Sequence, residues 1–286
     1  MHEQHDSIDQ ASQLRYMALN TAADPVSDRA TVWAITSGKG GVGKSVAALS
    51  IAMTMAQDGR KVLLVDADEN LGKLDILLGV HPAFRLSDVA AGKTDIEDSL
   101  EHPFENLSFI GAASGTITQA ALSSSDREIF LENVHRSSLH VSDIIIDTGA
   151  GINDNVLDYT TRADHVVVVS NPEPTTIVDA YAVVKLTSQK NPSAEFHLIM
   201  NGKGSPVEND DAAEKLRIAI RHFLDRHISY AGFVPYDEAV SGSVIQQIPL
   251  IRYSNTSPAS LCLQAIARRV MQEQSRESHH QQHIFA

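Results

Sequence analysis

The residues best suited to chemistry form a glycine-rich loop near the beginning of the chain. Gly38 is followed after four residues by Gly43, Lys44 and Ser45, which is the spacing of a phosphate-binding loop. Glycines let such a loop curl until several backbone N–H groups point at one polyphosphate. Lys44 can place positive charge on the outer phosphates of ATP, and the Ser45 hydroxyl can bind Mg²⁺. The residues predicted to bind the nucleotide here are Gly38, Lys39, Gly40, Gly41, Val42, Gly43, Lys44, Ser45 and Val46.

The segments on either side of the loop have the patterns of a strand and a helix. Residues 31–37 form a short apolar run typical of a buried strand, and residues 45–57 carry apolar residues at helical spacing. The loop should therefore open a helix, where the free N–H groups and the helix dipole favour an anion. A glycine-rich turn that matched the motif by chance would lack this context, so we favour nucleotide binding.

Aspartates lie at the ends of two other predicted strands. Asp66 and Asp68 close the run at 61–66, and Asp147 closes the run at 142–147. A magnesium nucleotide needs hard oxygen groups near its metal and a group that positions the attacking water. We expect Asp66 and Asp147 to support Mg²⁺ through its bound water, and Asp68 to orient the attacking water. One aspartate alone would suggest a turn or cap, but two such strand ends beside one loop favour function.

Strand-like and helix-like patterns alternate along the rest of the chain. The strand runs are apolar throughout, as expected for strands that are covered on both faces. Alternation of this kind predicts an α/β protein: one P-loop NTPase domain with a mainly parallel, doubly wound sheet flanked by helices, which binds ligands at the carboxyl ends of its strands. The further predicted strands are 107–112, 164–170, 195–201 and 228–234, and the further predicted helices are 125–138, 153–162, 175–189, 207–226 and one that starts at 258.

Composition divides the chain into three regions. Residues 1–30 are predicted to be a flexible leader with one short helix, because residues 7–10 have capping-box spacing. The nucleotide-binding domain is predicted to span residues 31–272. Residues 273–286 are predicted to form a polar, disordered tail, and its three histidines fit a solvated tail better than a metal site.

Overall composition excludes several classes of protein. No apolar run approaches the ~20 residues that span a membrane, and the N-terminus does not resemble a signal peptide, so we expect a cytoplasmic protein. The single cysteine, Cys262, lies between two leucines and is expected to be a small core residue. One cysteine excludes iron–sulfur chemistry, which needs clustered thiolates. The net charge of −13 argues against nonspecific DNA binding, which needs a basic face.

Lys39, directly after the first glycine, gives the loop a family resemblance. The sequence Lys-Gly-Gly-Val-Gly-Lys-Ser over residues 39–45 resembles the deviant Walker motif of the MinD/ParA ATPases. In that family the additional lysine reaches the nucleotide of a partner subunit. The resemblance thus implies that Lys39, Lys44 and Asp68 are catalytic and that ATP binding and homodimerisation form one event.

The resemblance covers most of residues 9–272 and is closest to the flagellar-number regulators FlhG, also called FleN or YlxH. It rests on residues 66–79 and 147–152, which resemble the two switch segments, and on residues 170–181 and 234–238. In the family the last of these segments holds adenine. The resemblance implies that Asn201, Pro235, Tyr236 and Asp237 contact the nucleotide.

A motif in the leader separates this chain from MinD and ParA relatives. Residues 9–15 match the Asp-Gln-Ala-x-x-Leu-Arg motif by which the FlhG family stimulates a partner GTPase, FlhF. The matching residues are Asp9, Gln10, Ala11, Leu14 and Arg15. The resemblance also implies contacts with flagellar switch (C-ring) proteins or with a flagellar transcription activator.

Some positions depart from the family pattern. Asn70 replaces the usual glycine of the first switch, and Gly149 replaces the usual alanine or proline of the second. The tail lacks the apolar-and-basic amphipathic helix by which family members reach membranes, which argues against ATP-dependent membrane attachment. The resemblance still leaves a polar or peripheral membrane location open.

Three functional interpretations remain at this point. The leading one is a slow, dimer-dependent ATPase that acts as a switch for the number or placement of flagella. A MinD-like protein that positions the cell-division site is disfavoured by the leader and the tail. A nucleotide-bound antiactivator that hardly hydrolyses ATP is kept open by Asn70 and Gly149.

Overall fold

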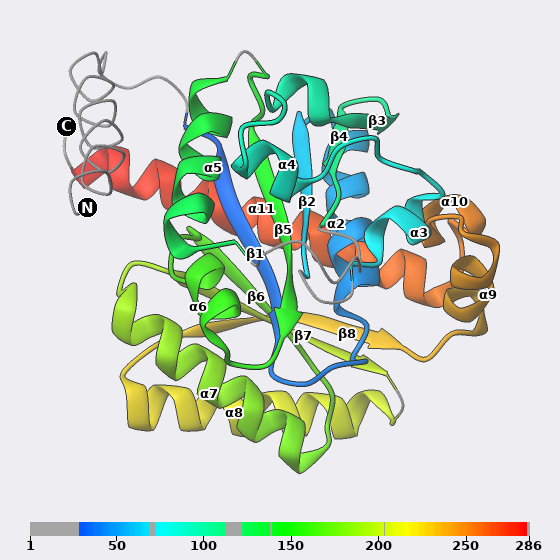
Figure 1. The fold of residues 1–286 in the computed structure, drawn as a ribbon. Helices are drawn as coiled ribbons and strands as arrows, with labels where there is room; N and C mark the ends of the chain where they lie inside the picture. The colour runs from blue at the N-terminus through cyan, green and yellow to red at the C-terminus, as the bar shows by residue number, and fades with distance from the viewer. Residues whose placement is uncertain (1–28, 69–71, 113–121, 138, 203, 285–286) are drawn as a thin grey trace, which may run out of the picture.

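Eight strands form one sheet in the order β3-β4-β2-β5-β1-β6-β7-β8 (Figure 1). β3 runs antiparallel to β4, and the other neighbouring pairs are parallel. The structure is a computed structural model and describes residues 29–68, 72–112, 122–137, 139–202 and 204–284. The predicted α/β architecture with a mainly parallel, doubly wound sheet is confirmed.

The strands agree with the predicted ones to within a few residues. β5 is the largest difference, since it continues three residues past Asp147 and includes residues 147–150 of the second switch segment. β3 was not predicted, because it is four residues long and only partly buried. The strands are β1 Thr31–Ser37, β2 Val62–Ala67, β3 Glu101–Phe104, β4 Leu107–Ile110, β5 Asp143–Ala150, β6 His165–Ser170, β7 Glu195–Gly202 and β8 Ile228–Pro235.

Helices cover both faces of the sheet (Figure 1). They include the six helices expected from the sequence, α2, α5, α6, α7, α8 and α11, and several short ones that were not predicted. The helices are α2 Lys44–Gln57, α3 Leu74–Leu78, α4 Leu86–Ala90, the 3₁₀ turn η1 Glu97–Ser99, α5 Ser124–Arg136, α6 Asp154–Thr160, α7 Pro174–Lys190, α8 Pro206–Leu224, α9 Glu238–Gln246, α10 Leu250–Tyr253 and α11 Pro258–Ile284.

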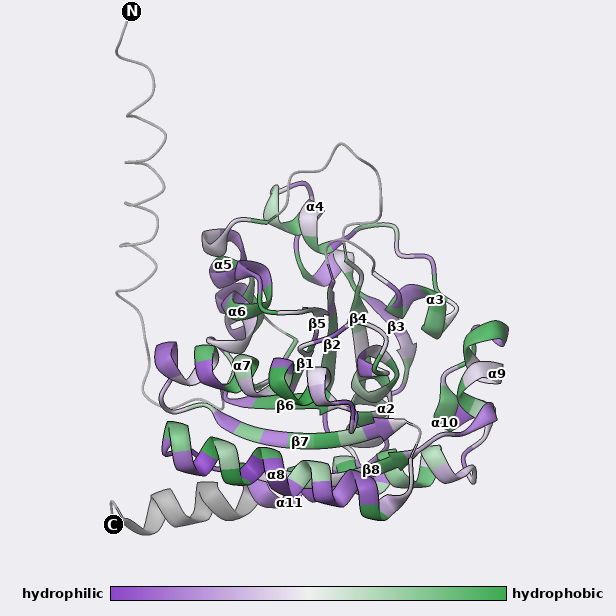
Figure 2. Ribbon diagram, turned by 90° about the horizontal axis from the view of Figure 1, so that it is seen from below, coloured by the Kyte–Doolittle hydropathy of each residue, from purple (hydrophilic) through white to green (hydrophobic). Residues whose placement is uncertain are grey.

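Each face of the sheet has its own hydrophobic core because successive strand residues point to opposite sides. In β1, Trp33 and Ile35 pack in the core formed with α2, α10 and α11. Val32 and Ala34 pack in the other core, which is formed with α4, α5, α6, α7 and α8. Figure 2 shows α8 with alternating hydrophobic and hydrophilic stripes, as expected for a helix with one side on the sheet.

The end of α11 corrects the predicted domain boundary. The structure continues the helix to Ile284, whereas a disordered tail was expected from residue 273. The Gln274 side chain donates a hydrogen bond to Oγ1 of Thr31 at 2.7 Å and accepts one from Arg60 at 2.8 Å. These contacts tie the helix to the start of β1, so the folded domain extends beyond residue 272.

Two predicted features lie outside the described residues: the leader motif at residues 9–15 and the substitution at Asn70. Among the helices that the structure describes, none has the length and apolar character needed to cross a membrane.

Candidate functional site

The glycine-rich loop connects the end of β1 to the start of α2, as predicted. Gly43 precedes the first helical residue with φ of 89°, a left-handed conformation that glycine adopts without strain. A Cβ atom at Gly43 would collide with the Asn201 side chain, and one at Gly38 would collide with Asp179. The loop therefore lies so close to neighbouring segments that both positions require glycine.

Lys44 and Asp147 form a buried ion pair at the base of the loop. Nζ of Lys44 lies 2.5 Å from Oδ1 of Asp147, and the two side chains are 7% and 2% exposed. The Ser45 hydroxyl donates a hydrogen bond to the same carboxylate. Burial raises the pKa of Asp147, and the Lys44 charge and the Ser45 hydroxyl oppose that rise. The predicted phosphate-binding lysine, magnesium ligand and acidic strand end thus meet at one point.

Asp66 lies beside Asp147 because β2 and β5 are neighbours, and the strand register pairs the two residues. Oδ2 of Asp66 accepts hydrogen bonds from the N–H groups of Lys73 and Leu74 at 2.9 and 3.0 Å. Burial, and next the charge of Asp147, raise the pKa of Asp66 to about 7 against these donors. A nearby divalent cation would favour the charged forms of both aspartates, so the pair suits the edge of a magnesium site.

Asp68 completes the acidic group. Its N–H donates to Oδ1 of Asp66 at 3.2 Å, and its charge contributes to the raised pKa of Asp147. A Cβ atom on Gly149 would lie 3.8 Å from Oδ1 of Asp68, so the two switch segments approach each other here. The structure therefore brings together Lys44, Ser45 and the three aspartates that the sequence singled out.

Lys39 lies apart from this buried group and points to a different partner. Its Nζ lies 2.8 Å from Oε2 of Glu173, and the two side chains are 47% and 57% exposed. The hydrogen bond to Glu173 raises the pKa of Lys39, so the lysine is charged at neutral pH. Lys39 is thus positioned at the surface by a residue of its own chain.

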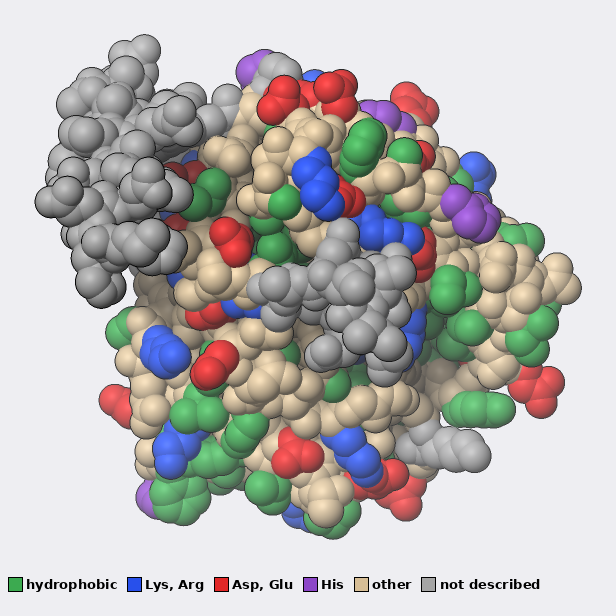
Figure 3. Space-filling model, viewed as in Figure 1, with side chains coloured by type: hydrophobic (Ala, Val, Ile, Leu, Met, Phe, Trp, Pro, Cys, Tyr) green, Lys and Arg blue, Asp and Glu red, His purple; other side chains and the backbone are tan. Residues whose placement is uncertain are grey.

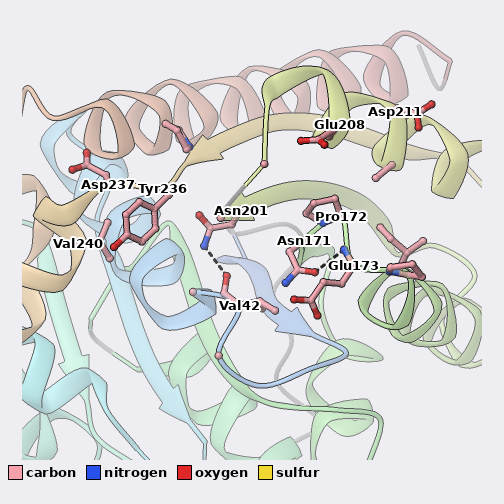
Figure 4. A pocket seen from close by; sticks show the side chains of 18 of the residues that line it. Val42, Asn171, Pro172, Glu173, Asn201, Glu208, Asp211, Tyr236, Asp237 and Val240 are labelled. Carbon is pink, nitrogen blue, oxygen red and sulfur yellow. Dashed lines mark hydrogen bonds between the residues drawn. The ribbon is translucent and has the colours of Figure 1, made fainter.

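A cavity of about 1030 Å³ opens beside the loop, lined by residues 41–43 and by segments after β6, β7 and β8 (Figure 4). Besides residues 41–43, four more residues predicted to bind the nucleotide line it, namely Asn201, Pro235, Tyr236 and Asp237. The aspartate group lies outside this lining. The cavity therefore lies where the base and sugar of a nucleotide would fit if the adjacent loop held its phosphates.

Several side chains in this region have structural tasks. Asn201 donates a hydrogen bond to the Val42 carbonyl at 2.6 Å and so fixes the loop (Figure 4). The Asp237 carboxylate accepts from the N–H groups of Ala239 and Ala259, which caps α9 and anchors the start of α11. Val46 packs against the core of the α2 face. Asp237 and Val46 can therefore offer a nucleotide mainly their backbone groups.

Sequence reasoning missed Glu173 as the partner of Lys39 and Asp179 as the neighbour of Gly38. Both lie after the carboxyl end of β6, the edge at which an open parallel sheet binds ligands. Their position after this strand end was the only feature of the sequence that could have suggested a role at the site. Nothing in the residue types indicated the pairing.

Comparison with known proteins points to one family. A family model described as ParA, NUBPL iron-transfer P-loop NTPase, matches residues 29–271. The chain is 36% identical over 239 residues to the antiactivator FleN of Pseudomonas aeruginosa, covering 84% of this chain and 85% of that protein. It is 33% identical over 205 residues to the flagellum site-determining protein YlxH of Helicobacter pylori, covering 70% and 68%.

Solved structures agree with this assignment at the level of the fold. The septum site-determining protein MinD of Pyrococcus horikoshii, solved in complex with Mg-ADP, matches with a TM-score of 0.68 and 22% identity. The match covers 84% of this chain and 96% of that one.

Proposed function

The chain belongs to the ParA/MinD family of P-loop NTPases, and on that basis we propose that it is an ATP-hydrolysing switch that dimerises on ATP and regulates flagella. The observation that carries the proposal is the convergence of Lys44, Ser45 and Asp147 beneath a glycine loop at a helix N-terminus. This donor set fits a magnesium triphosphate, because it offers a cation for phosphate, a hydroxyl for the metal, and acidic groups behind both.

Each residue has a defined task in the proposed reaction. The loop N–H groups and Lys44 would hold the phosphates, Ser45 would bind Mg²⁺, and Asp66 and Asp147 would support the ion through bound water. Asp68 orients the attacking water. The relative solved with Mg-ADP supports ATP and Mg²⁺ as the ligands. When bound, Mg²⁺ would neutralise charge that develops on the transferred phosphoryl group.

Dimerisation is proposed from the position of Lys39. Two triphosphates that face each other across an interface repel, and one lysine from each subunit would offset that repulsion. Lys39 is half-exposed and bonded to Glu173, an exposed residue whose contact is easily exchanged. ATP binding by a second copy would thus compete with Glu173 for the lysine.

The flagellar role is proposed from the two relatives named above. One is named as an antiactivator and the other as a flagellum site-determining protein. We propose that the ATP-bound dimer restrains a flagellar transcription activator, or contacts flagellar switch proteins, in the cytoplasm or at its periphery. The net charge of −13 supports partners other than nonspecific DNA.

The biochemical test is gel filtration with light scattering, together with phosphate release, in ATP and Mg²⁺. Lys39→Ala should remain monomeric and lose hydrolysis. The matched control is Lys190→Ala, an exposed lysine at the far end of α7, which should behave like the parent. If Lys39→Ala dimerises and hydrolyses normally, the proposed mechanism is wrong. A parent that dimerises on ATP without turnover would instead support a non-hydrolysing antiactivator.

The cellular test is to replace the gene by the Lys39→Ala variant and count flagella by electron microscopy. An antiactivator that fails to dimerise should release its activator, so flagellar number and flagellar gene transcription should rise. A change in the division site with normal flagella would instead support a MinD-like role.

The leader carries a separate part of the proposal. A peptide of residues 1–25 should accelerate GTP hydrolysis by an FlhF-type GTPase, and Gln10→Ala should abolish the effect. The same substitution in the full chain should leave ATP binding unchanged. A peptide without effect over a wide concentration range would contradict this part.

A further inference from the structure

A second cluster of polar side chains lies at the amino ends of the parallel strands, on the opposite side of the sheet from the end that carries the phosphate loop. His165 is the first residue of β6, Glu195 is the first residue of β7, and His197 follows two positions later. The register pairs His165 with Glu195, and strand alternation puts Glu195 and His197 on one face of the sheet. Parallel strands begin at this edge, so the cluster lies outside the nucleotide site.

The ligand atoms of the cluster have the spacing of a metal site. Nδ1 of His165 lies 3.2 Å from Nε2 of His197 and 3.8 Å from Oε2 of Glu195. One potential ligand atom from each residue lies within 4.8 Å of the other two. A tetrahedral ion with bonds of about 2.0–2.2 Å holds its ligands about 3.4 Å apart. The observed separations lie on either side of that value.

Both imidazoles are buried, and the carboxylate beside them is partly exposed. The side chains of His165 and His197 are 7% and 2% exposed, while Glu195 is 37% exposed and leaves a path to solvent. A neutral imidazole offers a lone pair to a cation, and the Glu195 carboxylate offers negative charge.

A second layer of residues orients the cluster. Oε2 of Glu273, on α11, lies 3.2 Å from Nδ1 of His197. A cation on Nε2 would make the opposite N–H a stronger donor toward this carboxylate, the arrangement that commonly supports metal-binding histidines. Trp33 stacks on His165 with ring centroids 4.1 Å apart and shields it from water.

We propose that His165, His197 and Glu195 bind one divalent transition-metal ion of the zinc class, with water as the fourth ligand. The ion would join β6 to β7 and, through the Glu273 contact with His197, fasten α11 to the sheet. Two nitrogen ligands favour Zn²⁺ or Co²⁺ over Mg²⁺, which prefers oxygen. The site therefore does not compete with the nucleotide for Mg²⁺.

The experiment uses the full chain with the five terminal histidines (His2, His5, His279, His280 and His283) replaced by glutamine, so that they cannot bind metal. After chelator treatment, Zn²⁺ is added, and bound metal is measured by mass spectrometry and by competition with a chromophoric chelator. We expect one Zn²⁺ per chain. Co²⁺ should give the visible absorption of a tetrahedral site and quench Trp33, the only tryptophan in the chain.

Variants distinguish the site from a plain hydrogen-bonded histidine pair. Glu273→Gln should weaken Zn²⁺ binding about 10–100-fold, and Glu195→Gln should weaken it at least as much. Zn²⁺ should raise the melting temperature of the parent and not that of Glu195→Gln, whose carboxylate is partly exposed, so the substitution should be tolerated by the fold. His222→Gln, an exposed histidine of α8, is the control and should change nothing. Absence of stoichiometric Zn²⁺, or unchanged affinity in both glutamate variants, would overturn the proposal.

Discussion

Lys44 and Asp147 neutralise each other inside the protein, 2.5 Å apart and almost fully buried. The lysine comes from the first turn of α2 and the aspartate from β5, so the pair fastens the phosphate loop to the second switch segment. A bound triphosphate would supply an alternative counter-charge for Lys44. Nucleotide binding and the position of the switch are therefore linked through one ion pair.

Asp147→Asn should destabilise the protein, because it leaves the Lys44 charge buried without its carboxylate. Breaking a buried pair from one side typically costs about 3–5 kcal/mol. Urea unfolding is the measurement, and Mg-ADP should restore part of the loss. The control is Asp58→Asn, which breaks an exposed pair with Arg268 and should cost at most about 1 kcal/mol. Equal effects of the two variants would show that the buried pair is unimportant for stability.

Asp66 should make the stability of the protein without nucleotide depend on pH. Its pKa of about 7 in the folded state exceeds the value of about 3.9 in an unfolded chain, so the folded state holds the proton more tightly. The resulting stabilisation is complete below about pH 4 and is lost as the pH rises through 7, at up to about 1.4 kcal/mol per pH unit.

Asp66→Asn should remove this component. The free energy of unfolding, measured in urea from pH 5 to 8, should fall more steeply for the parent than for the variant up to about pH 7. Parallel curves would contradict the raised pKa. Because Mg²⁺ favours the charged carboxylate, Mg-ADP binding at pH 6.5 should also release protons, which calorimetry in buffers of different ionisation enthalpy detects.

The sequence predicted the parts of the fold and site that depend on local pattern. Buried strands such as β6 appear in the sequence as nearly continuous apolar runs. The glycine spacing identified the phosphate loop and the strand and helix that flank it. The helices α3, α4 and α10 are too short to show a helical period in the sequence, and tertiary contacts determine whether they form. The predicted disordered tail differs from the structure for another reason. Polar composition suggested disorder, but Gln274 is held by Arg60 and Thr31.

Pairings between distant residues could not be predicted. Glu173 binds Lys39, although 134 positions separate them in the sequence, and His165 and His197 contact each other from neighbouring strands. Each histidine lies in an apolar run and looks like an ordinary core residue when taken alone. Only the strand order and register bring such residues together.

Glu173→Gln should favour the ATP-bound dimer, because it weakens the contact that holds Lys39 within its own chain. The variant should dimerise at a lower ATP concentration than the parent in light-scattering titrations. The control is Asp211→Asn, which removes one acidic charge from the rim of the same cavity but pairs with Lys215. If both variants shift the titration equally, general charge and not release of Lys39 explains the effect.

Asp68→Ala and Lys44→Ala should separate hydrolysis from binding. Asp68 lies at the site through its contact with Asp66 and does not line the phosphate loop, so its loss should spare ATP affinity. Without a group to orient water, hydrolysis should fall about 10²–10⁴-fold, and the dimer should accumulate. Lys44→Ala should instead weaken binding of ATP itself, because it removes the cation at the phosphates. Fluorescent-nucleotide titration and phosphate release measure both quantities in each variant. Comparable losses of ATP affinity in the two variants would show that Asp68 supports the structure of the site and not the attacking water.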